Sequence, residues 1–191
     1  LEYYTKDVYD EQEFERCFKL AVKEHVRGDL RGTEPAKEML VKYLQSDLLP
    51  PLSKAQKEQE LSFFEQGYQF EGFIDCMKPN EDGTWTIIDY KTGAAPKDVN
   101  NKNAGYMYQL ALYRLAVEKQ FRRKVKSCEL HYLQELAVVG LADDDEYEQY
   151  LAEALAKCRE ISTKPCQEEA FACAVGKQCE YCPYSYMCKQ K

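Results

Sequence analysis

Apolar residues recur along this chain at two different spacings, which predict its helices and strands. A spacing of three to four residues predicts amphipathic helices over residues 10–26, 35–44, 103–119 and 143–161. Short runs rich in β-branched and aromatic residues predict strands over residues 59–64, 68–77, 84–90 and 126–133. The first three strands follow one another directly, so we expect them to form an antiparallel meander.

A turn-forming run at residues 78–83 separates the second and third predicted strands, which we expect to pair as a hairpin. Side chains alternate along a strand, so Asp89 and Lys91 point to one face and the carbonyl of Tyr90 lies between them. Asp75 can reach the same place from the neighbouring strand. Carboxylates that follow apolar strand runs are costly to bury alone. The hairpin therefore predicts a site for Mg²⁺ or Mn²⁺ beside a lysine, the alternative being a solvated surface hairpin.

Composition sets broad limits on this interpretation. With 191 residues and 45% apolar content, the chain can form one ordinary globular core, and we expect a single domain over residues 1–191. Its predicted parts are a helical segment, a core and a cysteine-rich tail, at residues 1–52, 53–165 and 166–191. No apolar run of about 18 residues and no secretory signal pattern is found, so we expect a cytoplasmic protein without membrane contact.

The net charge of −7 argues against a general nucleic-acid binder, because phosphate contacts require Lys or Arg at the interface. Two local basic clusters could overcome this sum, one at residues 122–126 and one formed by Arg27 and Arg31. Each cluster could contact DNA or could equally be a solvated helix end. Charge alone leaves both interpretations open.

The hairpin motifs resemble those of a known nuclease family. Gly72, Ile74 and Asp75 match its G-x-I-D motif, and residues 89–93 read D-Y-K-T-G. Together they resemble the RecB-like branch of the PD-(D/E)XK nuclease superfamily. Gln109 and Tyr113 match the Q-x-x-x-Y motif of that branch and lie on one helix face at a spacing of four. His25 lies in an upstream helix, as the metal-binding histidine of the family does, although Ala21 replaces the usual glycine.

This resemblance implies an α/β (α+β) fold with a restriction-endonuclease-like core, in which a central mixed sheet is flanked by helices. It also implies Mg²⁺- or Mn²⁺-dependent hydrolysis of DNA, as an exonuclease acting on single strands or duplex ends in repair or recombination. The implied catalytic residues are Asp75, Asp89, Lys91, Gln109 and Tyr113. The implied metal ligands are His25, Asp75, Asp89 and the carbonyl of Tyr90.

A non-catalytic DNA-binding or scaffold module of a helicase–nuclease complex is the alternative function. The chain has no G-x-x-x-x-G-K-[ST] loop, so a helicase motor would belong to a longer chain or to a partner subunit. The sequence does not begin with Met and starts within what looks like folded sequence, so we expect it to be a domain of a longer protein.

A run of cysteines near the end of the sequence predicts a second metal site. Cys179, Cys182 and Cys188 form a C-x2-C-P-x4-C motif, and such thiolates bind iron–sulfur clusters or zinc. Resemblance to the AddB, Cas-associated and exonuclease V groups implies a 4Fe–4S cluster with Cys17 as the fourth ligand. Alternatively, Cys173 completes a local zinc site, or the fourth ligand lies outside this sequence. Nine cysteines in a cytoplasmic chain argue against a disulfide framework.

The remaining candidate metal ligands are expected to be structural. Cys76, Cys128, Cys158 and Cys166 are interpreted as small apolar fillers or surface thiols, and His131 as a hydrogen-bonded sheet histidine.

Overall fold

The computed structural model describes residues 1–26, 33–98, 102–141, 143–165, 175–176, 179–180, 182–183 and 185–186. The chain divides into two compact units, Leu1–Leu155 and Ala156–Lys191. The first unit contains the entire sheet, and the boundary falls within the last helix. The division predicted from sequence, into parts ending at residues 52 and 165, stays a prediction.

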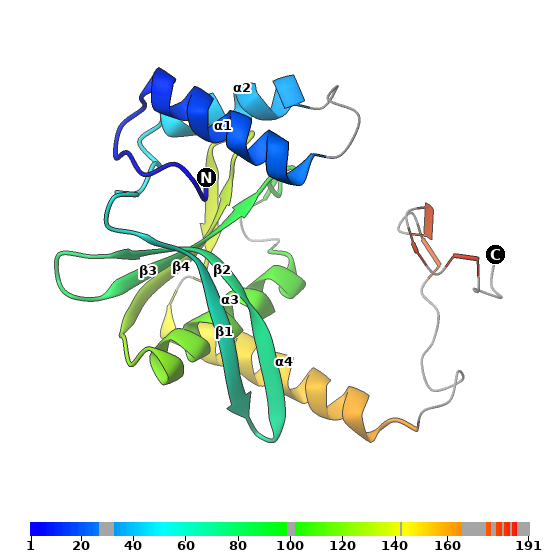
Figure 1. Ribbon diagram of the computed structural model, residues 1–191. Helices are drawn as coiled ribbons and strands as arrows, with labels where there is room; N and C mark the ends of the chain where they lie inside the picture. Colours follow the sequence, from blue (N-terminus) through cyan, green and yellow to red (C-terminus); the bar gives the residue numbers. More distant parts are fainter. Residues whose placement is uncertain are drawn as a thin grey trace. The chain divides into compact units, whose positions relative to one another are not determined.

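A five-stranded sheet with four helices makes up the regular structure of the described residues (Figure 1). The helices are α1 (Glu11–His25), α2 (Thr33–Leu44), α3 (Ala104–Gln120) and α4 (Asp144–Thr163). The strands are β1 (Gln56–Glu65), β2 (Tyr68–Pro79), β3 (Trp85–Lys91), β4 (Val125–Tyr132) and β5 (Ala137–Gly140). Among the described helices, none has the length and hydropathy required to cross a bilayer.

The strands lie in their sequence order across the sheet, β1-β2-β3-β4-β5. All neighbours are antiparallel except β3 and β4, which are parallel and are joined through α3. The predicted meander and the mixed α/β fold are thus confirmed. The prediction missed β5, because four residues are too few to show a period-two pattern.

Local sequence explains the tight connection within the first hairpin. β1 and β2 are joined by the two residues Gln66 and Gly67, whose φ angles are 48° and 86°. Two consecutive positive φ angles are typical of the turn that matches the twist of paired strands, and glycine adopts them without steric cost. The hairpin register is therefore fixed by its turn.

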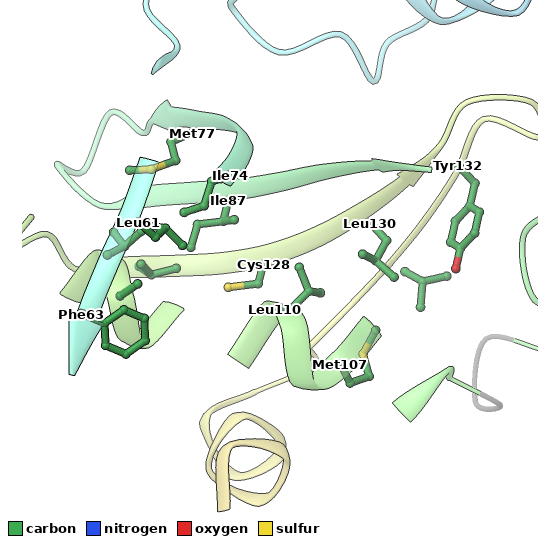
Figure 2. Close-up of a cluster of buried hydrophobic side chains, with 14 residues drawn as sticks. Leu61, Phe63, Ile74, Met77, Ile87, Met107, Leu110, Cys128, Leu130 and Tyr132 are labelled. Atoms are coloured by element: carbon green, nitrogen blue, oxygen red, sulfur yellow. The ribbon is translucent and has the colours of Figure 1, made fainter. Parts of the chain in front are cut away.

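Side chains from both faces of the sheet build two separate cores. Figure 1 shows α1 and α2 together on one side of the sheet and α3 on the other. On the α3 side, Met107 and Leu110 of the helix belong to one buried cluster with Ile74, Ile87 and Leu130 of the sheet (Figure 2). On the α1 and α2 side, the buried cluster consists of Tyr4, Phe14, Cys17, Leu44, Leu52, Cys76 and Ile88.

The alternation of side chains along β3 determines which face of the sheet carries the candidate catalytic residues. Ile87 belongs to the core beneath α3, and Ile88 belongs to the core beneath α1 and α2. By the same period of two, Asp89 and Lys91 face α3, whereas Tyr90 packs against the opposite core.

The outer edge of β1 is closed by the end of α3. Gln120 accepts a hydrogen bond from the Ser62 amide (3.0 Å) and donates one to the Glu60 carbonyl (3.4 Å). Lys119 forms an ion pair with Glu65, at the end of β1. These contacts satisfy part of an otherwise open strand edge and fix α3 against the hairpin.

Replacing Gly140 by alanine should destabilise the protein, because the new Cβ would overlap the carbonyl oxygen of Cys128 on the neighbouring strand. Relief requires the backbone of β4 or β5 to shift, and overpacking of this kind costs about 1–3 kcal/mol. Urea unfolding of Gly140→Ala measures the loss. Gly72→Ala is the matched control, because nothing lies within 4 Å of its added Cβ, and equal losses in both variants would contradict this explanation.

Candidate active site

The candidate site forms where β2 separates from β3. The two strands pair only from Cys76 to Pro79 on β2, and Asp75 is the first residue beyond this pairing. Its Oδ2 accepts a hydrogen bond from the backbone amide of Tyr90 at 2.8 Å. A side-chain carboxylate thus replaces a backbone carbonyl as the acceptor, which holds Asp75 beside the end of β3.

Asp89 is a buried acid with incomplete compensation. The residue is 3% exposed, and Lys91 Nζ lies 2.5 Å from its Oδ2 as an ion pair. The angles of this contact fall outside those of a hydrogen bond, so Oδ2 accepts none from the described residues. Burial raises the pKa of Asp89, Lys91 opposes the shift, and the negative charge of Asp75 adds to it.

Lys91 connects the strand to α3. Its Nζ donates to Gln109 Oε1 (3.2 Å), and Gln109 Nε2 donates to Tyr113 Oη (2.8 Å). The Lys91 ammonium also lies 4.2 Å from the centre of the Tyr106 ring. Gln109 and Tyr113 therefore share one helix face, as their spacing predicts, and Gln109 contacts the strand that carries Asp89.

Tyr113 is held in its protonated form. Burial raises its pKa to about 12, and the charges of Asp89, Asp75 and Glu58 add to the shift. Because its oxygen accepts the hydrogen bond from Gln109, the phenolic hydrogen is available for another acceptor.

The Tyr90 ring anchors the backbone between the two acids. It meets Tyr43 edge-on with ring centres 5.6 Å apart, and Tyr43 Oη lies 2.8 Å from Nδ1 of buried His131. His131 also contacts Glu129 through Nε2 at 3.0 Å, so its predicted structural role is confirmed. This packing fixes both the Tyr90 amide that binds Asp75 and the Tyr90 carbonyl predicted to bind metal.

His25 and Asp75 line one cavity of about 300 Å³, together with Tyr90 and Glu58. His25 is the exposed last residue of α1, and its Nε2 lies 3.4 Å from Tyr3 Oη. The histidine thus shares a cavity with Asp75, whereas Asp89 and Lys91 do not line that cavity, and its role as a ligand stays a prediction.

Sequence reasoning missed Glu58, which lies across from Asp75 between two strand pairs, Lys57 with Cys76 and Gln59 with Ile74. Its φ of 47° is unusual for a non-glycine residue. Partial burial and the charge of Asp75 raise its pKa. In an antiparallel hairpin, the residue numbers of opposite partners always add up to the same sum. Counting outward from the turn would therefore have placed this third acid opposite Asp75.

The donor chemistry of the site fits a hard divalent cation. Asp75 and Asp89 supply carboxylate oxygens, and the buried Asp89 Oδ2 has no hydrogen-bond donor within the described ranges. Mg²⁺ and Mn²⁺ favour oxygen donors, and a cation here would offset the repulsion between the two acids. Over the same ranges, no three His, Cys, Asp or Glu side chains converge into a complete metal-binding group.

The basic run at residues 122–126 lies at the other end of β3. The Arg123 guanidinium stacks 4.0 Å from the Trp85 ring, and Lys126 forms an ion pair with Asp82 at 3.1 Å. Trp85 begins β3 and Lys91 ends it, so these cations do not extend the candidate site. Arg27 and Arg31 lie outside the described residues.

The predicted cysteine ligands are described only in part. Cys179 accepts a hydrogen bond from the Gly176 amide (3.4 Å) through Sγ, and Cys188, Cys173 and Cys166 lie outside the described residues. Cys17 is buried in α1, and its thiol donates to the Tyr3 carbonyl at 3.2 Å. Burial raises the pKa of Cys17, which favours the thiol over the thiolate that binds metal.

Three of the cysteines predicted to be apolar fillers or surface thiols lie within the described residues. Cys76 and Cys128 are buried in the two cores, as predicted, and Cys158 is half-buried.

Comparison with known proteins decides the family. The profile of the PD-(D/E)XK nuclease superfamily matches residues 4–189. The chain belongs to this superfamily. Its members are nucleases, which are hydrolases, and they typically use Mg²⁺ or Mn²⁺. The superfamily thus accounts for the mixed sheet flanked by helices.

Solved structures are similar in fold. A protein named "Putative exonuclease" from Eubacterium rectale is 16% identical, with a TM-score of 0.59, over 90% of this chain and 69% of its own. SSO0001 is also 16% identical, with a TM-score of 0.41, over 92% of this chain and 93% of its own. No curated protein matches the sequence. At 16% identity, the likeness to the protein from Eubacterium rectale shows the fold alone.

Replacing Asp89 by asparagine should stabilise the metal-free protein at neutral pH. The folded state raises the pKa of Asp89, so the cost in stability develops as the pH rises from the ordinary pKa of Asp and is complete above the raised value. The gain should shrink as the pH falls towards about 4, the ordinary pKa of Asp, and should vanish below it, where the carboxyl is neutral in both states. Unfolding midpoints in EDTA across this pH range measure the effect.

Asp82→Asn is the matched control, because hydrogen bonds from Thr84 and Lys126 lower the pKa of Asp82 to about 2. This variant should lose stability at neutral pH, and the difference should diminish as the pH falls towards 2. Added Mg²⁺ should stabilise the wild type, by about 2.7 kcal/mol at one hundred times its Kd, but should have little effect on Asp89→Asn. Equal Mg²⁺ responses would exclude Asp89 as a ligand.

Proposed function

We propose that this protein is an Mg²⁺- or Mn²⁺-dependent deoxyribonuclease of the RecB-like type, acting as an exonuclease in DNA repair or recombination. The observation that carries the proposal is a continuous line of contacts from Asp89 through Lys91 and Gln109 to Tyr113. Asp75 lies next to this line, held by the Tyr90 amide. A mere surface hairpin would need neither a buried acid nor this connection.

Asp75, Asp89, the Tyr90 carbonyl and His25 would hold the cation. When bound, such a cation lowers the pKa of a water molecule and offsets negative charge on the phosphate. The buried Asp89 Oδ2, which forms an ion pair with Lys91 but accepts no hydrogen bond from the described residues, is the observation in the structure that agrees with this assignment.

The chain's own residues position and stabilise the reacting phosphate. Lys91 has its ammonium held by Asp89, by Gln109 and by the face of Tyr106, which pre-organises a positive charge. Hydrolysis joins a water oxygen to phosphorus and breaks the bond to one sugar oxygen, which leaves as a hydroxyl. Lys91 stabilises the charge that develops on the phosphate, and protonated Tyr113 can donate a hydrogen bond to it.

A nucleic-acid substrate follows from the family. Action on DNA ends and a helicase partner remain parts of the proposal. The fold-level likeness to the named exonuclease from Eubacterium rectale agrees with end-directed cleavage. A helicase motor on a longer chain or on a partner subunit would supply single strands to the site.

A non-catalytic DNA-binding or scaffold module is the competing function. The presence of Asp75, Asp89 and Lys91 together favours an enzyme, because a structural hairpin gains no stability from an undercompensated buried carboxylate. Incubation with single-stranded and duplex DNA, each labelled at one end, tests the proposal. Cleavage in Mg²⁺ or Mn²⁺ but not in EDTA is expected, and product lengths distinguish cleavage from the end and cleavage within the strand.

Asp89→Ala should abolish hydrolysis without unfolding the protein, since the variant removes a ligand and relieves the cost of burying a charge. Lys91→Ala should lower kcat by roughly 10²–10³-fold, a typical cost of losing one preorganised charge-stabilising donor, while metal affinity is largely retained. Asp82→Ala, an exposed acid outside the site, should retain wild-type turnover. Wild-type turnover by Asp89→Ala would favour the scaffold function instead.

We also propose that Cys179, Cys182 and Cys188 hold a 4Fe–4S cluster, with Cys17 as the fourth ligand. Thiolates in one short run select iron–sulfur clusters or zinc over hard cations. Anaerobically purified protein should then be brown, and Cys182→Ser should bleach it. Visible absorbance together with iron, sulfide and zinc analysis measures the outcome.

Colourless protein with one zinc per chain, in which Cys173→Ser is as damaging as Cys182→Ser, would instead establish the local zinc site. Cys128→Ser is a suitable control, because this thiol is buried in the sheet core and should affect stability but not metal content. Absence of both metals from freshly prepared, reduced protein would exclude a metal site at the cysteine run.

A further inference from the structure

A second cavity, of about 600 Å³, lies beside the candidate site and has no role in the proposed chemistry. It is lined by the β1–β2 hairpin on one side and by the first part of α3 on the other. Its volume is within the range of about 300–1,000 Å³ that is typical of sites for small organic groups.

The lining of this cavity is aromatic and apolar. Phe63 and Phe70 stack across the hairpin, with ring centres 5.2 Å apart and planes inclined by 19°. Tyr106 and Leu112 line the side formed by α3. The charged residue of this lining, Glu71, is an acid. Walls of this kind suit a neutral aromatic ring and disfavour a phosphate, because a phosphate would lose its hydration and meet a carboxylate instead of a cationic partner.

The position of the cavity identifies the occupant. Gln109 and Tyr113 line it, and both belong to the contact line that begins at Asp89. Tyr106 lines it as well and carries the Lys91 ammonium on its ring. A group that enters the cavity is therefore adjacent to the place at Lys91 where the proposed function puts the phosphate. In a nucleic acid, the neutral aromatic group nearest to a phosphate is the base on the adjoining sugar.

We propose that this cavity receives one unpaired nucleobase of the strand that is cut, so that it selects single-stranded DNA at the active site. The proposal rests on the proposed function and deepens it. A base inside a duplex is stacked and paired, and must leave the helix to enter. Stacking on aromatic side chains tolerates every base, so selection acts on strandedness and not on sequence.

The walls of the cavity are held in place before any substrate binds. Gln120 and Lys119 fasten the far end of α3 to β1, and Tyr108 donates to Glu153 of α4 at 2.9 Å. The two-residue turn at Gln66 and Gly67 fixes the hairpin that presents Phe70. Little ordering is then needed on binding, which preserves the gain from stacking.

The test compares two phenylalanines of one hairpin. Phe70→Ala removes a ring from the cavity wall, whereas Phe64→Ala removes a ring that is 68% exposed and does not line the cavity. Fluorescence anisotropy in EDTA measures affinity for a single-stranded oligonucleotide, for a blunt duplex, and for the same single strand without bases near its end. Unfolding curves confirm that each variant is folded.

Phe70→Ala should weaken binding of the ordinary single strand by about 5- to 100-fold, the usual effect of losing one stacking partner. Binding of the duplex and of the strand without bases should change little, and Phe64→Ala should resemble the wild type. Leu112→Trp, which fills the cavity, should reproduce the loss. For the wild type itself, removal of the terminal bases should lower both affinity and cleavage rate.

Equal binding of strands with and without bases by the wild type would overturn the proposal, even if no variant folds. An equal loss in Phe64→Ala and Phe70→Ala would do the same. These outcomes differ from failure of the proposed function, which appears as absence of metal-dependent cleavage of any DNA by the wild type. A protein that cuts DNA but ignores the missing bases would retain the nuclease function and lose only the base pocket.

Discussion

The hydrogen bond between the Tyr90 amide and the Asp75 carboxylate is the interaction on which the site depends. β2 and β3 stop pairing at Cys76, and without a substitute acceptor the next amide of β3 would be left unsatisfied. Asp75 supplies that acceptor from its side chain. The separation of the strands thus needs no loss of backbone hydrogen bonding, and it leaves an opening in which a second acid, Asp89, can be placed.

The second acid makes the opening electrostatically demanding. Asp89 is buried, Lys91 compensates its charge only in part, and Asp75 adds repulsion. Such a pair lowers the stability of the isolated protein, yet it creates a strong preference for a cation and an oriented lysine. The packing of Tyr43, Tyr90 and His131 on the other face keeps the backbone from relaxing away from this arrangement.

Much of this architecture could be predicted from periodicity and motif spacing. Alternation in β3 correctly placed Asp89 and Lys91 on one face, and helical spacing placed Gln109 and Tyr113 together. Glu58 was missed, because its position opposite Asp75 depends on the strand register and its φ of 47° is invisible in composition. The short β5 was also missed, because four residues are too few to show alternation. The stacking of Arg123 on Trp85 was beyond prediction, since the two residues are distant in sequence.

The location of the basic run affects how this protein meets its substrate. Arg123 and Lys126 face Trp85 and Asp82 at the start of β3, and the chain as a whole carries a charge of −7. Long-range attraction to a polyanion will therefore be weak, and diffusional encounter will not be accelerated by steering. A nuclease of this kind gains protection against indiscriminate damage, because it does not accumulate along intact duplexes. Under the proposed function, its cutting is then governed by whatever brings a strand end to it.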